Sequence, residues 1–176
     1  MRLFIAIKFS PEMENTLTEL QKQMKEKSIT GNYTNCRNLH LTLAFIGEYD
    51  DPQKVINALE QISFDPFRIS LEERTGTFGD ILWIGTKKAP ALMSLAQNVR
   101  KALDKARIHY DRKKFKPHIT LVRKARIYAN QEKTLNEIKL EKCSMTVDSF
   151  SLMLSRRTDG RLVYTELGHI SAKEKR

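Results

Sequence analysis

Two short segments of the chain carry the residue types of acid–base chemistry at the same spacing. Each has a histidine followed two positions later by a threonine, in His40-Leu41-Thr42-Leu43 and in His118-Ile119-Thr120-Leu121. Side chains alternate between the two faces of a β-strand, so the histidine and threonine share one face and the apolar residues share the other. The apolar face predicts burial in a core, which leaves imidazole and hydroxyl to line a groove.

A facing pair of histidines can supply an acid and a base together. Near neutral pH an imidazole accepts a proton when it is neutral and donates one when it is charged. Phosphodiester cleavage needs both functions, because a water is activated on one side of phosphorus and a leaving oxygen is protonated on the other. A threonine hydroxyl on the same face could donate a hydrogen bond to a non-bridging phosphate oxygen. The motifs therefore favour phosphodiester cleavage, with these candidate residues: His40, His118, Thr42 and Thr120.

The two motifs lie at equivalent places of an internal repeat. Residues 2–11 match residues 81–90 at an offset of 79, and the two motif histidines are 78 residues apart. The apolar stripes of two expected helices follow the same shift, with Met13, Leu17, Leu20 and Met24 matching Leu92, Ala96, Val99 and Leu103. We expect repeat 1 over about residues 2–79, repeat 2 over about 80–170, and a tail over 171–176.

Each repeat is expected to run strand, helix, strand, helix, strand, strand. The second helices are predicted over residues 52–62 and 131–138, and turns are predicted at Gly79-Asp80 and Asp159-Gly160. This order favours the α+β class, with two antiparallel sheets that face a central cleft and carry their helices on the outer faces. We expect residues 1–176 to form a single bilobal domain in which His40 stands opposite His118.

The charge of the chain favours a polyanionic partner. There are 31 Lys+Arg against 21 Asp+Glu, a net charge of +10. Basic residues gather between positions 107 and 126, around the second motif, and again at Arg156, Arg157 and Arg161. A solvated surface is the alternative explanation for either cluster. No apolar run approaches the roughly 18 residues of a membrane span, so we expect a cytoplasmic protein without a membrane partner.

Metals and cofactors are not indicated by the sequence. Cys36 and Cys143 are far apart, and neither stands in a zinc-binding spacing. The chain also lacks a GxSxG elbow, a GxxxxGK[ST] phosphate loop and an HExxH motif. We therefore expect no metal and no cofactor. A monomer is expected, because the repeat already supplies both sides of a cleft.

The segments HLTLAFIGEYD and FKPHITLVR resemble the paired His-x-Thr-x motifs of the two-histidine (2H) phosphoesterases. More narrowly they resemble the RNA 2′,3′-cyclic phosphodiesterase or 2′-5′ RNA ligase (LigT/ThpR-like) family, and the likeness continues through FGDILWIG to SLMLSRRTDGRLVYTELG. The resemblance implies metal-independent hydrolysis of a terminal 2′,3′-cyclic phosphate to a 2′-phosphomonoester, on RNA ends or cyclic-phosphate nucleotides. It also implies that His40 is the proton donor, that His118 is the proton acceptor, and that both motif threonines bind the phosphate.

Three further residues could contact the substrate. The family pattern also has an arginine at Arg123, which could neutralise phosphate charge, but strict alternation puts this residue on the face opposite His118 unless the strand ends or bulges. Phe45 and Trp83 could stack a base, although alternation places Phe45 with the core side chains. The other two histidines, at positions 109 and 169, have no matching motif and are expected to be ordinary surface or edge residues.

Other functions stay open at this point. A small α+β sheet with a basic face can bind RNA without catalysis. The same motifs also fit a two-histidine phosphodiesterase that acts on 2′-5′ oligonucleotides or on ADP-ribose cyclic phosphate, and they fit reversible 2′-5′ RNA ligation. The sequence is symmetric in its two motifs, so the donor and acceptor roles rest on the family resemblance.

Overall fold

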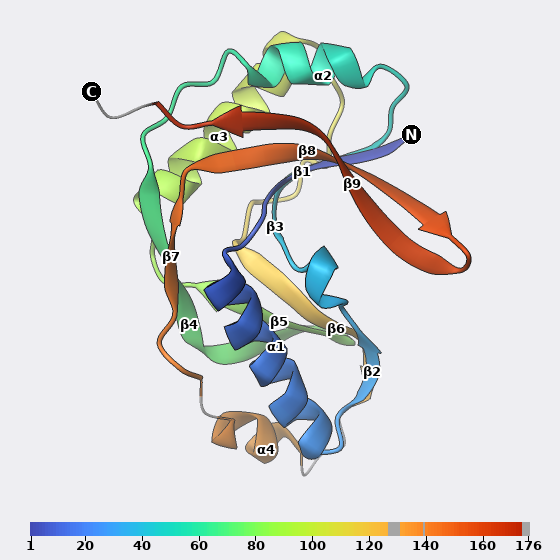
Figure 1. Ribbon diagram of the computed structural model, residues 1–176, viewed down its shortest axis with the longest axis vertical. Helices are drawn as coiled ribbons and strands as arrows, with labels where there is room; N and C mark the ends of the chain where they lie inside the picture. The colour runs from blue at the N-terminus through green and yellow to red at the C-terminus, as the bar shows by residue number, and fades with distance from the viewer. Residues whose placement is uncertain (127–130, 139, 174–176) are drawn as a thin grey trace.

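The computed structural model describes residues 1–126, 131–138 and 140–173, and within them the strands form two antiparallel sheets (Figure 1). One sheet has the strand order β3-β1-β8-β9, and the other has the order β2-β6-β5-β4-β7. The strands are β1 (Arg2–Ile7), β2 (Thr30–Tyr33), β3 (Leu41–Glu48), β4 (Phe67–Phe78), β5 (Ile81–Thr86), β6 (His118–Arg126), β7 (Ser144–Val147), β8 (Ser149–Thr158) and β9 (Arg161–Ser171). The predicted α+β class with two antiparallel sheets is confirmed.

The helices of the described chain are four α-helices and one short 3-10 turn. They are α1 (Pro11–Glu26), α2 (Pro52–Leu59), α3 (Pro90–Lys105), α4 (Gln131–Glu137) and η1 (Cys36–Asn38). Each of the first three begins with proline, where the missing amide hydrogen costs no helical hydrogen bond. None of the described helices is long and apolar enough to cross a membrane.

Each sheet combines strands from both repeats. β1 of repeat 1 pairs with β8 from the end of the chain, whereas β5 of repeat 2 pairs with β4 from the end of repeat 1. The turn at Gly79-Asp80 therefore lies within one sheet, where Phe78 pairs with Ile81 across the hairpin. The boundary between the repeats does not separate the two sheets.

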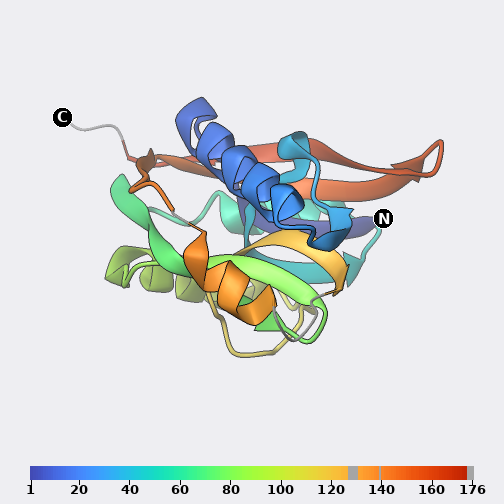
Figure 2. The same ribbon diagram turned by 90° about the horizontal axis from the view of Figure 1, so that it is seen from below.

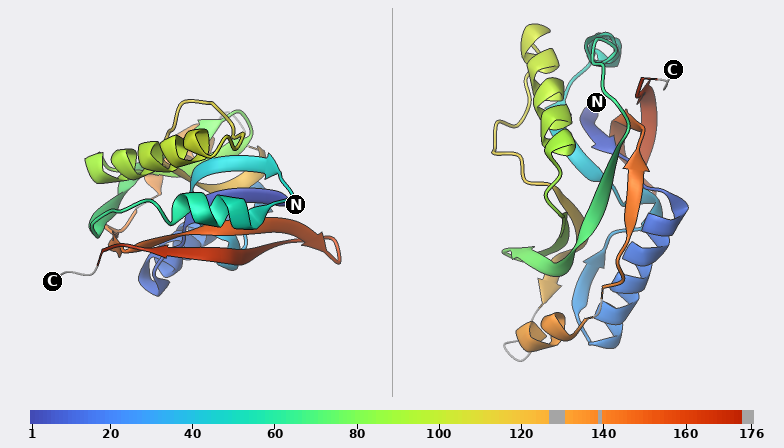
Figure 3. Two further views of the ribbon diagram at one scale, coloured as in Figure 1. Left: turned by 90° about the horizontal axis from the view of Figure 1, so that it is seen from above. Right: turned by 90° about the vertical axis from the view of Figure 1, so that its left-hand side faces the viewer.

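The two long helices cross over between the sheets. α1 follows β1 but packs on β6 of the other sheet, and α3 follows β5 but packs on β3 of the other sheet, with further contacts to β4 of its own. Figures 2 and 3 show the two helices on opposite sides of the molecule. Both predicted apolar stripes are buried, as expected. Each histidine strand is thus covered by the helix of the other repeat, which fixes the two strands relative to each other.

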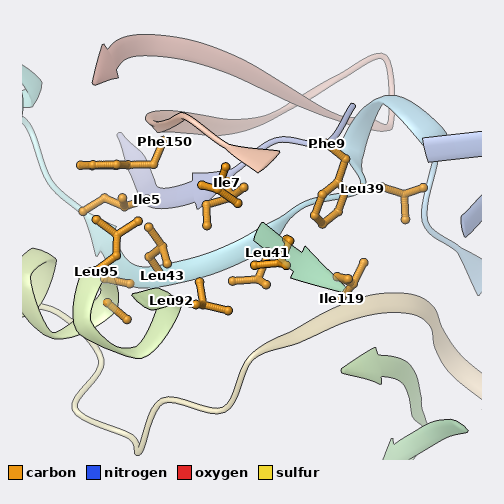
Figure 4. Packing of buried hydrophobic residues seen from close by; sticks show 14 of the residues in the cluster. Ile5, Ile7, Phe9, Leu39, Leu41, Leu43, Leu92, Leu95, Ile119 and Phe150 are labelled. Atoms are coloured by element: carbon orange, nitrogen blue, oxygen red, sulfur yellow. The ribbon is translucent and has the colours of Figure 1, made fainter. Parts of the chain in front are cut away.

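A continuous core lies beneath the histidine strands. Leu41 and Leu43 of β3 pack between Ile5 of β1 and Leu92 and Leu95 of α3 (Figure 4). These side chains are almost completely excluded from solvent. Burying a residue of this size contributes about 1.5–3 kcal/mol. The apolar face that alternation predicts for each motif therefore anchors it in the core.

Some boundaries differ from the prediction. The helix predicted over residues 52–62 ends at Leu59, where the chain turns with a hydrogen bond from Ile62 N to Leu59 O. The tail is predicted to begin at residue 171, but the hydrogen-bonded backbone continues beyond that residue. Ser171 is the last residue of β9, and the backbone amide of Lys173 donates to Phe64 O over 2.9 Å. Residues 174–176 of that tail lie outside the described residues.

Candidate active site

The two motif histidines are held in the same way. Nδ1 of His40 lies 2.6 Å from Asn38 O, and Nδ1 of His118 lies 2.7 Å from Lys116 O. A carbonyl oxygen only accepts hydrogen bonds, so Nδ1 carries the proton in each neutral ring. That leaves Nε2 of each histidine as the nitrogen available to accept a proton.

Aromatic rings support both imidazoles. His40 packs against Phe4 and Tyr164, with ring centroids at 4.9 and 5.3 Å, and these two rings also contact each other at 4.8 Å. His118 lies against Phe78 and Trp83, at 5.2 and 6.2 Å. Phe4 and Trp83 are separated by the repeat offset of 79 residues, so the internal repeat extends to the rings behind the histidines. These contacts restrict the orientation of each imidazole.

The motif threonines face the same side as their histidines. Thr42 Oγ1 lies 3.0 Å from His40 Nε2, where the hydroxyl can donate to the unprotonated nitrogen. Thr120 lines a pocket together with His40 and Arg123. The structure therefore brings hydroxyl groups from both sheets to one cleft, as alternation within each motif predicts.

Arg123 also faces the cleft, because β6 contains a bulge. Thr120 pairs with Trp83 and Val122 pairs with Leu82, which leaves Leu121 between them without a partner in β5. The extra residue reverses the alternation, so that Leu121 and Val122 are both buried. The face that strict alternation assigns to Arg123 is wrong, and the bulge considered as a remedy is present.

The same irregularity occurs in β3. Ala44 pairs with Ile5 and Thr42 pairs with Ala6, which leaves Leu43 without a partner in β1. Phe45 therefore turns toward the groove, where the guanidinium of Arg2 lies 5.1 Å from its ring centroid. The placement of Phe45 among the core side chains is wrong for the same reason as the placement of Arg123.

Buried hydrogen bonds hold the bulge of β6. Gln21 of α1 is only 5% exposed, and its amide donates to Thr34 O and Leu121 O, each over 2.9 Å. The Thr34 hydroxyl donates to Thr120 O, and the Thr34 amide donates to Leu121 O. Gln21 and Thr34 thus fix the backbone between the motif threonine and Arg123.

The electrostatics of the cleft act on His40. Burial lowers the pKa of His40 below its ordinary value, and the positive charges of Arg123 and His118 lower it further. The hydrogen bond to Asn38 O opposes this shift. His40 is therefore more readily neutral in the free protein than an exposed histidine would be.

A groove of about 810 Å³ runs past His40 and Thr42, and it shares Arg123 and Tyr164 with a second pocket of about 340 Å³.

The remaining histidines lie apart from this groove. His109 is exposed, and His169 is exposed beside Glu166, with 3.3 Å between its Nδ1 and the carboxylate. Within the described chain, no three His, Cys, Asp or Glu side chains gather in a way that could hold a metal ion.

Several groups at the site were not foreseen from the sequence. Tyr164 reaches His40 from β9, and no local pattern marks it. Gln21 sits on a helix as a single polar residue in an apolar stripe, which is a weak sign of a buried hydrogen bond. Phe4 could have been found, because the repeat offset aligns it with Trp83.

Comparison with known proteins agrees with this geometry. A family model described as the 2′-5′ RNA ligase superfamily matches residues 9–159. The chain belongs to this superfamily. The RNA 2′,3′-cyclic phosphodiesterase of Aquifex aeolicus (strain VF5) is 34% identical over 149 residues, which cover 78% of this chain and 77% of the relative. That of Thermotoga maritima is 26% identical over 176 residues, which cover 95% and 93%.

The superfamily is also represented among solved structures. The crystal structure of E. coli LigT complexed with 3′-AMP matches with a TM-score of 0.78 and 25% identity, over 98% of both chains. The apo form of the same protein matches with a TM-score of 0.80. The family and fold expected from the paired motifs are thereby confirmed.

Proposed function

We propose that the protein hydrolyses the 2′,3′-cyclic phosphate at RNA ends to a 2′-phosphomonoester, without a metal ion. The observation that carries this proposal is the matched pair of histidines, each held through Nδ1 so that Nε2 can exchange a proton. Curated relatives named RNA 2′,3′-cyclic phosphodiesterase, similar over most of this chain, support its assignment as a phosphodiesterase.

The proposed reaction uses the two histidines in opposite roles. Nε2 of His118 takes a proton from water as the water oxygen bonds to phosphorus. The bond from phosphorus to O3′ breaks, and protonated Nε2 of His40 gives its proton to O3′. The phosphate stays on O2′, and the protons balance because one histidine gains what the other loses. Family resemblance is what assigns His40 as the donor.

The lowered pKa of His40 bears on the donor role. A donor must be protonated before reaction, whereas burial and the charge of Arg123 favour the neutral form of His40. A bound phosphodiester brings a negative charge into the cleft, which raises the pKa of a neighbouring imidazole. Substrate binding would therefore help to charge His40 at the point where it must donate.

The remaining groups would stabilise the phosphate. Thr42 and Thr120 can donate hydrogen bonds to the non-bridging oxygens, and the guanidinium of Arg123 can pair with the developing charge. For Thr42 this means that the hydroxyl leaves His40 Nε2, 3.0 Å away, and turns to the phosphate. His40 Nε2 is then free to carry the proton.

We also propose that the 176 residues act as one bilobal domain, as a monomer, and in the cytoplasm. The continuous core cluster, which includes residues of both sheets, supports the first of these. The same step with the 5′-hydroxyl of a second RNA end in place of water would join the two ends through a 2′-5′ bond, as O3′ leaves.

Hydrolysis of a panel of phosphodiesters in excess EDTA tests the function. The substrates are a 2′,3′-cyclic mononucleotide, an RNA oligonucleotide with a 2′,3′-cyclic end, a 2′-5′ oligonucleotide and ADP-ribose cyclic phosphate. We expect the RNA end to be opened with the phosphate on the 2′ oxygen. Faster turnover of either of the last two substrates would reassign the substrate. RNA binding without turnover would indicate a binding module and contradict the proposal.

A further inference from the structure

The β8–β9 hairpin extends beyond the sheet that it belongs to. β1 pairs with β8 only as far as Arg2 opposite Ser155, whereas β8 and β9 continue to pair up to Thr158 opposite Arg161. Residues 156–163, named here the arm, therefore form a two-stranded projection from the body of the protein. Figure 1 shows it reaching past the end of β1, and the view in Figure 2 agrees.

The arm carries three exposed arginines on eight residues. Arg156 and Arg157 line the larger groove with His40, and Arg157 and Arg161 line the second pocket. In the part of the chain that the structure describes, no carboxylate forms an ion pair with any of the three guanidinium groups. The arm thus directs positive charge along both branches of the groove.

A hydrogen bond ties the arm to the catalytic candidates. The side-chain amide of Asn38 donates to Leu162 O on the arm over 2.9 Å, while Asn38 O accepts from His40 Nδ1 over 2.6 Å. Tyr164, directly after the arm, packs edge-on against the His40 ring. The arm is therefore held beside the reacting centre. Its apolar side chains, Leu162 and Val163, are 41% and 37% exposed.

We propose that the arm binds the RNA strand on the 5′ side of the terminal cyclic phosphate, by contacts between its arginines and the backbone phosphates of the RNA. This inference rests on the proposed function, because it takes the strand end to be bound at His40. A strand whose last phosphate lies there must leave along the groove, and both branches pass Arg157. Guanidinium groups suit phosphate oxygens, and the exposed apolar side chains offer contact surface to unpaired bases.

The test compares two substrates of one reaction. The arm variant carries Arg156→Gln, Arg157→Gln and Arg161→Gln. The matched control carries Lys54→Gln, Lys101→Gln and Lys105→Gln, which remove the same charge from exposed positions on α2 and α3. Each protein is assayed on an RNA oligonucleotide with a 2′,3′-cyclic end and on the 2′,3′-cyclic mononucleotide, and thermal unfolding confirms that both variants fold.

We expect kcat/KM of the arm variant to fall by about 10²-fold on the oligonucleotide and by less than about threefold on the mononucleotide. The slope of log kcat/KM against log salt concentration should decrease by about 2 for the oligonucleotide, because a phosphate contact on a single strand contributes about 0.7. Equal losses on both substrates, or an equal loss in the control variant, would overturn the proposal.

Binding of the same oligonucleotide, measured by fluorescence anisotropy, separates this proposal from the proposed function. If the wild-type protein hydrolyses neither substrate, the function is wrong, and a selective loss of RNA binding in the arm variant would still support the arm. If the wild-type protein hydrolyses both and the arm variant binds RNA as tightly as the control, only the proposal for the arm fails.

Discussion

Phe45 and Arg123 occupy the same place in the two repeats, three residues after the motif threonine, and both line the groove. Each owes this orientation to a bulge, because Leu43 in β3 and Leu121 in β6 have no partner in the neighbouring strand. The repeat therefore preserves an irregularity as well as a motif. One repeat uses the position for an aromatic ring, and the other uses it for a cation.

Arg123→Gln should reduce catalysis and raise the pKa of His40. Removing a group that stabilises developing charge typically costs about 10²- to 10³-fold in rate. The positive charge of Arg123 lowers the pKa of His40, so its removal should move the NMR titration of the His40 ring to higher pH. Arg126→Gln, at an exposed position of the same strand, is the control. An unchanged or lower pKa of His40 would show that Arg123 does not act on it.

Thr42→Val and Thr120→Val should each lower kcat, because each removes a hydroxyl and keeps the shape of the side chain. A lost donor to the phosphate is expected to cost about 10²-fold, the lower end of the range for a single such donor. Thr42→Ser and Thr120→Ser should retain most of the rate, since they keep the hydroxyl. Steady-state kinetics on the cyclic mononucleotide measures kcat of each variant. A valine variant with wild-type kcat would show that the hydroxyl of that threonine does not contribute to catalysis.

Gln21→Leu should destabilise the protein and weaken the positioning of Arg123. The substitution takes the amide donor away from Thr34 O and Leu121 O. Leu121 O keeps the hydrogen bond from the Thr34 amide, whereas Thr34 O loses its Gln21 donor, and a buried acceptor left without a partner costs about 1–3 kcal/mol. Denaturant unfolding measures this loss against Gln97→Leu, an exposed position on α3. Equal free energies of unfolding in the two variants would mean that the Gln21 hydrogen bonds do not stabilise the bulge.

The sequence could predict those parts of the fold that local patterns determine. The helical period of the apolar residues predicts the buried face of α1, which includes Leu17, and the buried face of α3, which includes Val99. Strict alternation from each histidine to the threonine two positions later predicts that the two side chains share one face of their strand. The family likeness followed from the two motifs at equivalent positions.

The parts that were missed depend on pairing between distant segments. The bulges at Leu43 and Leu121 are set by the register with β1 and β5, which alternation along a single strand does not contain. The short polar strand β2 has no apolar pattern to reveal it. Tyr164 reaches His40 only because β9 joins the sheet of β1 and β3, an exchange of strands that the order of elements leaves open.

Single-turnover hydrolysis of an RNA oligonucleotide with a 2′,3′-cyclic end, in excess EDTA, tests the central claim most directly. His40→Ala and His118→Ala should each lower the rate by about 10²- to 10⁴-fold, because each removes one proton-transfer group. His109→Ala, at an exposed position without a matching threonine, should retain the wild-type rate. A rate near that of the wild type in either His40→Ala or His118→Ala would contradict the two-histidine mechanism.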